Sequence, residues 1–376
     1  MQTPPRRIVN AGTPPAAPYS HAVAADGLIY LSGVIAEDGS RQVVGKGDVR
    51  AQTRAVIERL RERLAAAGSS LDRVVSVMVY LTSAADFGAM NEEYATFWPE
   101  DPPTRTTIVA GLVLPGALVE MSMIAVPPRA ERVVVHPDGW QRSPSPYSYA
   151  IRTGDTLFLS GLVSRNGRDN TVVPGDVPAQ TRVVLDNAGE LLRAAGMTHA
   201  NVVSARVYLP DGTTFQQMNG EYRRFFATEP PARATVQAPL AGPHYNVEIT
   251  LVASSAPRTV VEPGPTRNPN LSSAVVAGRR VYLSGMLGNR PDNAGDVKGQ
   301  TAETLATIVR ALEAAGAAAD DVVDSLVYLT NLDDYAAMND AYRAFLPGGF
   351  PARATVQSGL FAPDGVVEIM MTAVKP

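Results

Sequence analysis

Apolar residues at helical spacing and apolar runs of strand length follow one another along the first third of the chain. The helical spacing runs from Val56 to Leu64, with Asp48 placed as an N-cap and Gly68 just past the end. A β-branched apolar run at 74–81 is typical of a strand buried on both faces. These positions predict a helix followed by a central strand.

Further elements complete a unit. Residues 29–31 predict a strand, and apolar residues three to four apart predict a second helix over 86–98. Two more strands are expected at 105–113 and 118–126, joined as a hairpin through 114–116. The order β-β-α-β-α-β-β predicts an α+β fold with two helices on one sheet. Since one sheet face stays open, three such units could close about a pseudo-threefold axis into a single-chain pseudo-trimer.

The unit occurs three times along the chain. The segments Leu-Ser-Gly, Gly-Asp-Val-x-x-Gln-Thr, Val-Tyr-Leu and Met-Asn-x-x-Tyr return in the same order in each copy. Arg105, Arg233 and Arg353 are equivalent and lie 128 and then 120 residues apart, which is the length of a small domain. Pro-rich stretches at the junctions predict short linkers. The expected domains are residues 1–130, 131–257 and 258–376.

Composition removes several classes of chemistry. The 376 residues include no Cys, which excludes disulfides, thiolate metal sites and a cysteine nucleophile. The four His are far apart, so we expect no metal site and no metal cofactor. A net charge of −4 with three Lys argues against nucleic acid as a partner. Without an apolar leader or an apolar run of about 18 residues, we expect a soluble, cytoplasmic protein with no membrane partner.

Three polar positions, an Asn, an Arg and a Glu, recur in each repeat and are candidates for chemistry. Asn is a mediocre helix former, so its return beside the apolar stripe of the second helix predicts a specific hydrogen bond, in a site or to a neighbouring loop. These residues are Asn91, Asn219 and Asn339. An Arg and a Glu lie 15 residues apart on the two arms of each expected hairpin. These pairs are Arg105 and Glu120, Arg233 and Glu248, and Arg353 and Glu368.

The turn of the predicted hairpin returns the chain, so that each Arg can lie near its own Glu at one end of the sheet. Arg offers a planar fork for a carboxylate, and Glu can orient water or act as a general acid or base. A cross-strand salt bridge is the alternative. The residue two before each Arg is Pro, whose rigid backbone fixes where the Arg side chain starts and favours a site.

These motifs resemble the Rid family of enamine and imine deaminases, the YjgF-type proteins often labelled L-PSP endoribonucleases. The resemblance rests on Pro-Ala-Arg-Ala-Thr-Val…Val-Glu-Ile, with Ser-Gly upstream and Asn in the second helix, and it covers the chain three times. It implies a chorismate-mutase-like fold that usually forms homotrimers, with sites between neighbouring subunits. This chain would then be a monomer that acts as an intramolecular trimer.

The resemblance also assigns roles residue by residue. The Arg would grip the substrate carboxylate and the Glu would position water and manage the proton. The implied catalytic residues are Arg105, Glu120, Arg233, Glu248, Arg353 and Glu368. The implied substrate-binding residues are Tyr19, Ser32, Gly33, Asn91, Thr107, Tyr147, Ser160, Gly161, Asn219, Thr235, Ser284, Gly285, Asn339 and Thr355. Each Thr stands where many deaminases carry Cys, and Leu271 replaces the expected Tyr in the third unit.

The implied reaction is hydrolysis of 2-imino or 2-enamino acids to 2-oxo acids and ammonia, in clefts between repeats and without a cofactor. Three alternatives stay open. One is a specialised enzyme that guides cyclisation, condensation or tautomerisation of an imine. The second is a module that binds a carboxylate ligand without turnover. The third is the ribonuclease activity of the label, which the acidic balance and sparse Lys disfavour.

Fused copies can diverge, whereas identical subunits cannot. The copies differ near the expected clefts, as at Gly116-Ala117, His244-Tyr245 and Asp364-Gly365. This difference predicts either distinct substrates or neutral drift in surface loops. With Leu271 and a loop four residues shorter, the third unit is expected to hold the most impaired cleft.

Overall fold

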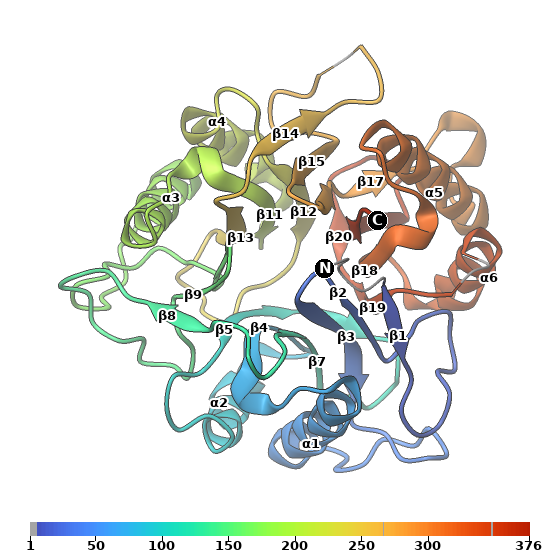
Figure 1. Cartoon of the computed structure of the whole chain (residues 1–376), viewed down its shortest axis with the longest axis horizontal. Coiled ribbons are helices and arrows are strands. Elements are labelled where there is room, and N and C mark those ends of the chain that lie inside the picture. Colours follow the sequence, from blue (N-terminus) through green and yellow to red (C-terminus); the bar gives the residue numbers. More distant parts are fainter. Residues whose placement is uncertain (1–5, 266, 347–348) are drawn as a thin grey trace.

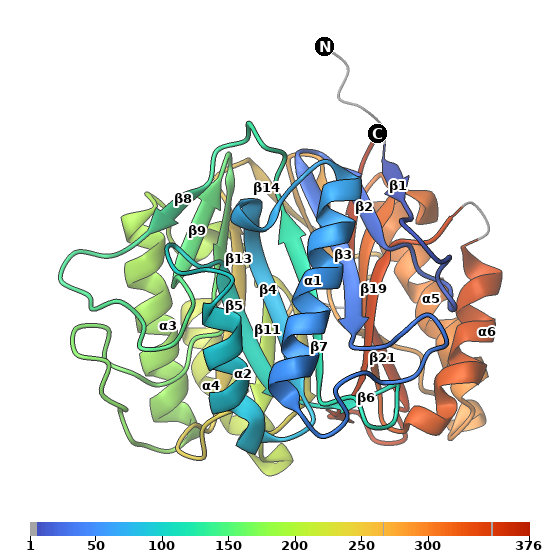
Figure 2. The same cartoon turned by 90° about the horizontal axis from the view of Figure 1, so that it is seen from below.

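The computed structural model describes residues 6–265, 267–346 and 349–376. Each repeat folds into one sheet with two long helices on its outer face, and the three repeats surround a common centre (Figure 1). In the view turned by 90°, the strands lie inside and the helices outside (Figure 2). The expected α+β class and the three repeated units are confirmed.

The first repeat contains the seven predicted elements and two additional strands. Its strands are β1 (Arg7–Val9), β2 (Ala22–Ala25), β3 (Leu28–Ile35), β4 (Val74–Leu81), β5 (Thr104–Val109), β6 (Gly111–Leu112) and β7 (Val119–Ala125). Its helices are α1 (Val49–Ala67) and α2 (Phe87–Ala95). Helix α1 begins and ends as predicted, because Asp48 accepts hydrogen bonds from two backbone N–H groups and Gly68 adopts a left-handed φ of 85°.

The other two repeats follow the same plan. The second comprises β8 (Val133–Val135), β9 (Ala150–Thr153), β10 (Thr156–Leu159), α3 (Val177–Ala194), β11 (Val202–Leu209), α4 (Phe215–Phe225), β12 (Ala232–Gln237) and β13 (Glu248–Ser254). The third comprises β14 (Arg258–Val261), β15 (Ala274–Ala277), β16 (Arg280–Leu283), β17 (Met286–Leu287), α5 (Val297–Ala314), β18 (Val322–Leu329), α6 (Tyr335–Phe345), β19 (Ala352–Gln357), β20 (Gly359–Leu360) and β21 (Val367–Val374).

The predicted hairpin is wrong. In the first sheet the strand order is β1-β2-β3-β7-β4-β5, so β4 lies between β5 and β7. Strand β5 pairs parallel with β4, whereas β7 pairs antiparallel with both β4 and β3. The pattern of apolar residues identified the strands but carried no information on their order, and the central apolar strand took the place between them.

Short strands connect each repeat to another. Strand β6 of the first repeat pairs with β19 of the third, and β20 of the third pairs with β12 of the second. A single bridge joins Leu240 of the second repeat to Ile108 on β5 of the first. All three repeats therefore exchange backbone hydrogen bonds at the edges of their sheets.

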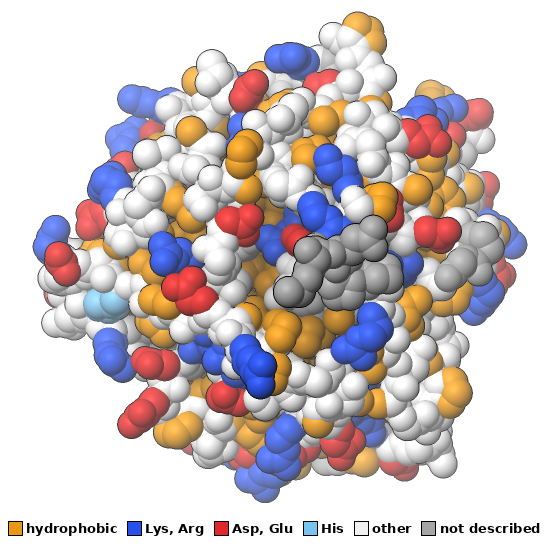
Figure 3. Space-filling model, in the orientation of Figure 1, with side chains coloured by type: hydrophobic (Ala, Val, Ile, Leu, Met, Phe, Trp, Pro, Cys, Tyr) orange, Lys and Arg blue, Asp and Glu red, His pale blue; other side chains and the backbone are white. Residues whose placement is uncertain are grey.

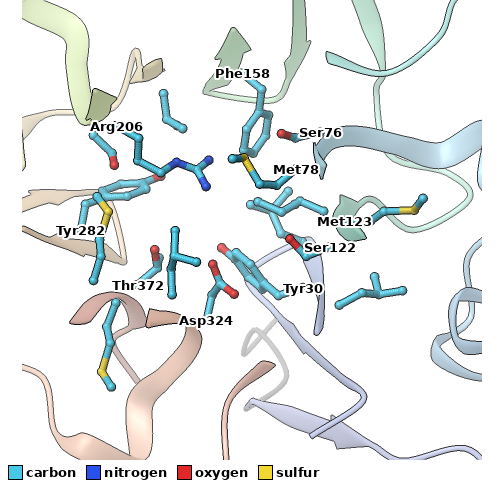
Figure 4. A pocket seen from close by; sticks show the side chains of 18 residues that line it. Tyr30, Ser76, Met78, Ser122, Met123, Phe158, Arg206, Tyr282, Asp324 and Thr372 are labelled. Carbon is cyan, nitrogen blue, oxygen red and sulfur yellow. The ribbon is translucent and has the colours of Figure 1, made fainter. Parts of the chain in front are cut away.

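The inner sheet faces share one apolar core. A cluster of buried residues includes Tyr80, Tyr208 and Tyr328, one from each repeat and each fully buried. Beside this cluster is a central cavity of about 80 Å³. Figure 4 shows Arg206 and Asp324 pointing into it, together with Tyr30 and Tyr282. The centre of the molecule is thus polar at one point and apolar around it.

Candidate functional site

An arginine at the start of β5 is held by the second helix of its own repeat. Arg105 Nη2 donates a hydrogen bond of 2.6 Å to Asn91 Oδ1 on α2. One turn along α2, the Tyr94 ring lies 4.8 Å from Arg105 Cζ. The Asn therefore orients the guanidinium, and the alternative that it ties down a neighbouring loop is wrong.

The second and third repeats hold their arginines in the same way. Arg233 Nη2 and Arg353 Nη2 each donate a 2.7 Å hydrogen bond, to Asn219 and Asn339 respectively. The rings of Tyr222 and Tyr342 lie 4.6 and 4.8 Å from the two guanidinium carbons. The contact of these Tyr with the arginines was not predicted from the sequence. The signal was their invariant place in Met-Asn-x-x-Tyr.

Each arginine faces the glutamate of another repeat, so the expected pairing within a repeat is wrong. Arg105 lines a cavity of about 290 Å³ with Glu248, and Arg353 lines one of about 50 Å³ with Glu120. Arg233 is the cation that acts on Glu368. We name these site 1 (Arg105 and Glu248), site 2 (Arg233 and Glu368) and site 3 (Arg353 and Glu120). The alternative of a cross-strand salt bridge fails because a central strand, β4, β11 or β18, separates the two residues of each predicted pair.

The glutamates are buried against glycine backbone. At Gly33, Gly161 and Gly285 an added side-chain carbon would overlap Oε1 of Glu120, Glu248 and Glu368 respectively. Glycine is therefore required there by close approach. Burial raises the pKa of each of these carboxyl groups to about 8, against the lowering effect of the neighbouring Arg. At neutral pH each Glu is mostly protonated and can donate a proton.

The serine before each of these glycines acts on the backbone. Ser160 Oγ accepts a 2.9 Å hydrogen bond from the Arg105 backbone N–H and donates one of 2.7 Å to the Ser148 carbonyl oxygen. The equivalent hydroxyls of Ser284 and Ser32 do the same at Arg233 and Arg353. In the structure these serines link two repeats and position the arginine.

Hydrogen-bonding groups remain unused at the same place in all three sites. Among the described residues, Nη1 of each Arg is buried without a partner, and so is Oγ1 of the Thr two residues further on. These atoms belong to Arg105 and Thr107, Arg233 and Thr235, and Arg353 and Thr355. An unpaired guanidinium N–H beside a hydroxyl matches the hydrogen-bonding needs of a carboxylate.

Site 1 has a larger cavity than site 3 and is lined by more aromatic rings. Tyr147 of the second repeat lies 5.7 Å from Arg105 Cζ, and Phe87 lies 5.8 Å from it. His244 and Tyr245 line the same cavity, and Arg165 Nε donates to the Tyr245 hydroxyl at 2.5 Å. The divergence at His244-Tyr245 is visible in the sequence, whereas nothing in the sequence pattern marks Arg165 as a residue of this site.

Site 2 departs most from the shared arrangement. Phe215, the counterpart of Phe87, stacks on Phe361 with ring centroids 4.4 Å apart. Leu271 precedes Ser272, whose N–H donates to the Pro231 carbonyl next to Arg233, so Leu271 belongs to site 2. By contrast, Tyr19 lies 6.0 Å from Arg353 Cζ. The missing Tyr of the third unit therefore affects the site of Arg233 rather than that of Arg353.

The described residues offer neither a metal site nor a membrane-spanning helix. No group of three or more His, Asp or Glu side chains that could hold a metal ion occurs among them. Within the same part of the chain, no helix combines the length and the apolar character needed to cross a membrane. Basic and acidic side chains are interspersed over the face drawn in Figure 3.

Comparison with known proteins gives matches of two kinds. One third of the chain is 42% identical over 123 residues to the 3-aminoacrylate deaminase RutC of Acinetobacter baylyi, covering 98% of that protein. A RutC family protein of Sulfurisphaera tokodaii is 40% identical over 109 residues, 29% of this chain and 87% of that protein. A solved chorismatase is 16% identical over 91% of this chain and 98% of its own, with a TM-score of 0.54, which indicates a shared fold.

The family assignment rests on the whole chain. The model of the endoribonuclease L-PSP family matches residues 10–127, 141–255 and 264–375, once in each repeat. The three matches coincide with the three sheets and include all three Arg, Asn and Glu positions. The chain belongs to the endoribonuclease L-PSP family, the Rid or YjgF-type proteins, and carries three tandem copies of its domain.

Proposed function

We propose that this protein hydrolyses 2-imino and 2-enamino acids to 2-oxo acids and ammonia in the sites between its repeats. The observation that carries the proposal is the buried, unpaired Arg Nη1 and Thr Oγ1 beside a buried Glu, repeated at all three sites. The similarity to a protein named for deamination of 3-aminoacrylate, an enamine of a carboxylic acid, supports the same chemistry.

The Arg and Thr hold the substrate carboxylate at a fixed distance from the Glu. The Arg–Asn hydrogen bond and the Tyr ring keep the guanidinium in place before the substrate arrives. Its unpaired Nη1 donor then gains the charge-assisted hydrogen bond that it lacks. Binding therefore favours small acids whose C=N group lies within reach of the Glu when the Arg holds the carboxylate.

The Glu manages one proton. In its protonated form it donates to the imine nitrogen, or to the β-carbon of an enamine, and so creates an electrophilic iminium ion. Water attacks the iminium carbon, and the carboxylate accepts a proton from that water. The Glu passes this proton to the amino nitrogen of the carbinolamine, the C–N bond breaks as the Glu takes up the hydroxyl proton, and ammonia leaves with the 2-oxo acid.

The test generates 2-iminopropanoate from alanine with an amino-acid oxidase and follows its loss by trapping with semicarbazide. The wild-type protein should accelerate this loss, and the triple variant R105A/R233A/R353A should not. Double Arg variants then report each site by itself. We expect site 1 to contribute most and site 2 least, because site 1 has the larger cavity and site 2 lacks the Tyr.

Glutamine at the three Glu positions separates turnover from binding. The variant E120Q/E248Q/E368Q should bind pyruvate, the product, as the wild type does but lose at least about 100-fold in rate, since it cannot transfer the proton. Equal rates in this variant and the wild type would contradict the proposal. Pyruvate binding with no turnover in the wild type would instead support the carboxylate-binding module.

A further inference from the structure

Site 3 contains a second buried guanidinium that the proposed reaction does not use. Arg63 lies on α1 of the first repeat, is 8% exposed, and lines the same cavity as Arg353 and Glu120. Its Nη1 has no hydrogen-bond partner in the described part of the chain. A buried, unpaired guanidinium is costly to fold, so its presence beside a substrate site indicates a ligand.

The surrounding charges leave this site strongly positive. Arg41 and Arg59 also line the cavity. Arg41 Nε lies 3.6 Å from Glu37 Oε2, and Arg59 Nη1 lies 3.8 Å from Glu37 Oε1. One carboxylate is thus shared by two guanidinium groups. Since Glu120 is mostly protonated at neutral pH, the site holds four guanidinium groups against one carboxylate. Such an excess suits a substrate with two negative charges.

The extra arginine belongs to one repeat. The equivalent position of the second repeat is Leu191 and that of the third is Ala311, both fully buried in their repeat cores. Site 1 is lined instead by Phe87, Tyr147 and Tyr245. A homotrimer would carry Arg63 three times, whereas the fused chain confines it to a single site.

We infer that site 3 takes a dicarboxylic imino acid, with Arg353 holding the carboxylate next to the C=N group and Arg63 holding the second one. This inference rests on the proposed function and names the substrate class of one of its sites. Because Arg63 and Arg353 line one and the same cavity, the chain between the two carboxylates is short, as in the imines of aspartate or glutamate. Their hydrolysis follows the steps given above and consumes one water for each ammonia released.

The test uses R105A/R233A, in which site 3 alone keeps its Arg. Imines of aspartate and alanine are generated with the corresponding amino-acid oxidases, and kcat/KM is measured for each. The substitution R63L introduces the residue that the second repeat has at this position. It should lower the ratio of kcat/KM for the aspartate imine to kcat/KM for the alanine imine by about 30-fold. R63K keeps the charge and should lower the ratio less. An unchanged ratio in folded R63L would overturn the inference.

A binding measurement keeps this inference separate from the proposed function. Oxaloacetate and pyruvate, the two products, are titrated into R105A/R233A with and without R63L. Loss of oxaloacetate binding by about 30-fold relative to pyruvate supports a dicarboxylate site even if no imine is hydrolysed. Equal effects on the two products overturn the dicarboxylate assignment whether or not the protein is a deaminase.

Discussion

At the scale of single residues, the Asn–Arg contact has a measurable consequence. In R233A/R353A, where site 1 acts alone, N91A should lower kcat/KM for an imine about 10- to 100-fold. The substitution removes the acceptor of a charge-assisted hydrogen bond and leaves Arg105 Nη2 unpaired. The control is E92A, the next residue along α2, whose side chain is 67% exposed. Equal rates in N91A and E92A would contradict this positioning role.

The raised pKa of the three Glu carboxyl groups predicts the pH profile. Because the proposed reaction requires the protonated acid, kcat/KM should be level near neutral pH and fall as pH rises through about 8. The measurement is the initial rate of imine loss from pH 6 to 10, corrected for the uncatalysed rate. A profile that rises through pH 8 would mean that the carboxylate acts first as a base.

At the scale of elements, Ser160 couples the end of β10 to the start of β5 in another repeat. S160A leaves the Arg105 N–H and the Ser148 carbonyl unpaired in a fully buried place. We expect a loss of about 1–3 kcal/mol in the free energy of unfolding, seen as a lower urea midpoint. S40A, at an exposed turn, is the control. Equal midpoints for the two variants would argue against this link.

The element scale also shows where prediction from sequence worked. Helix α1 was predicted to its caps because Asp48 and Gly68 act within a few residues of the helix ends. Helix α2 ends at Ala95, earlier than the predicted end at Trp98. The Trp98 ring instead packs against Tyr94, with ring centroids 4.6 Å apart. Strand pairing is a long-range property, and the hairpin prediction failed for that reason.

At the scale of the whole molecule, we predict a monomer in solution, because contacts that a homotrimer makes between subunits lie within one chain. Light scattering should give a mass near 39.8 kDa. A mass three times larger would contradict this expectation. The mass therefore tests whether the three repeats close into a trimer within a single chain.

The central cavity predicts a pH dependence of stability. Burial raises the pKa of Asp324 to about 6, against the lowering effect of Arg206. The folded state therefore binds this proton more tightly than the unfolded state, so the contribution of Asp324 to stability is fully present below about pH 4 and is lost as pH rises through 6. Relative to D324N, which does not titrate, the wild type should lose about 2–3 kcal/mol from pH 4 to 7 in urea unfolding. If the difference in free energy of unfolding between the wild type and D324N stayed constant from pH 4 to 7, the raised pKa of Asp324 would be contradicted.

The repeats, their caps and the recurring Arg, Asn and Glu could be read from the chain, because each depends on neighbours a few residues away or on repetition of a local pattern. The sequence did not reveal which Glu lies beside which Arg. That pairing depends on a central strand, β4, β11 or β18, lying between the Arg strand and the Glu strand of each repeat, and on one repeat packing against the next. The same holds for Arg63: the repeats align it with Leu191 and Ala311, but only the tertiary structure places it in the cavity of Arg353.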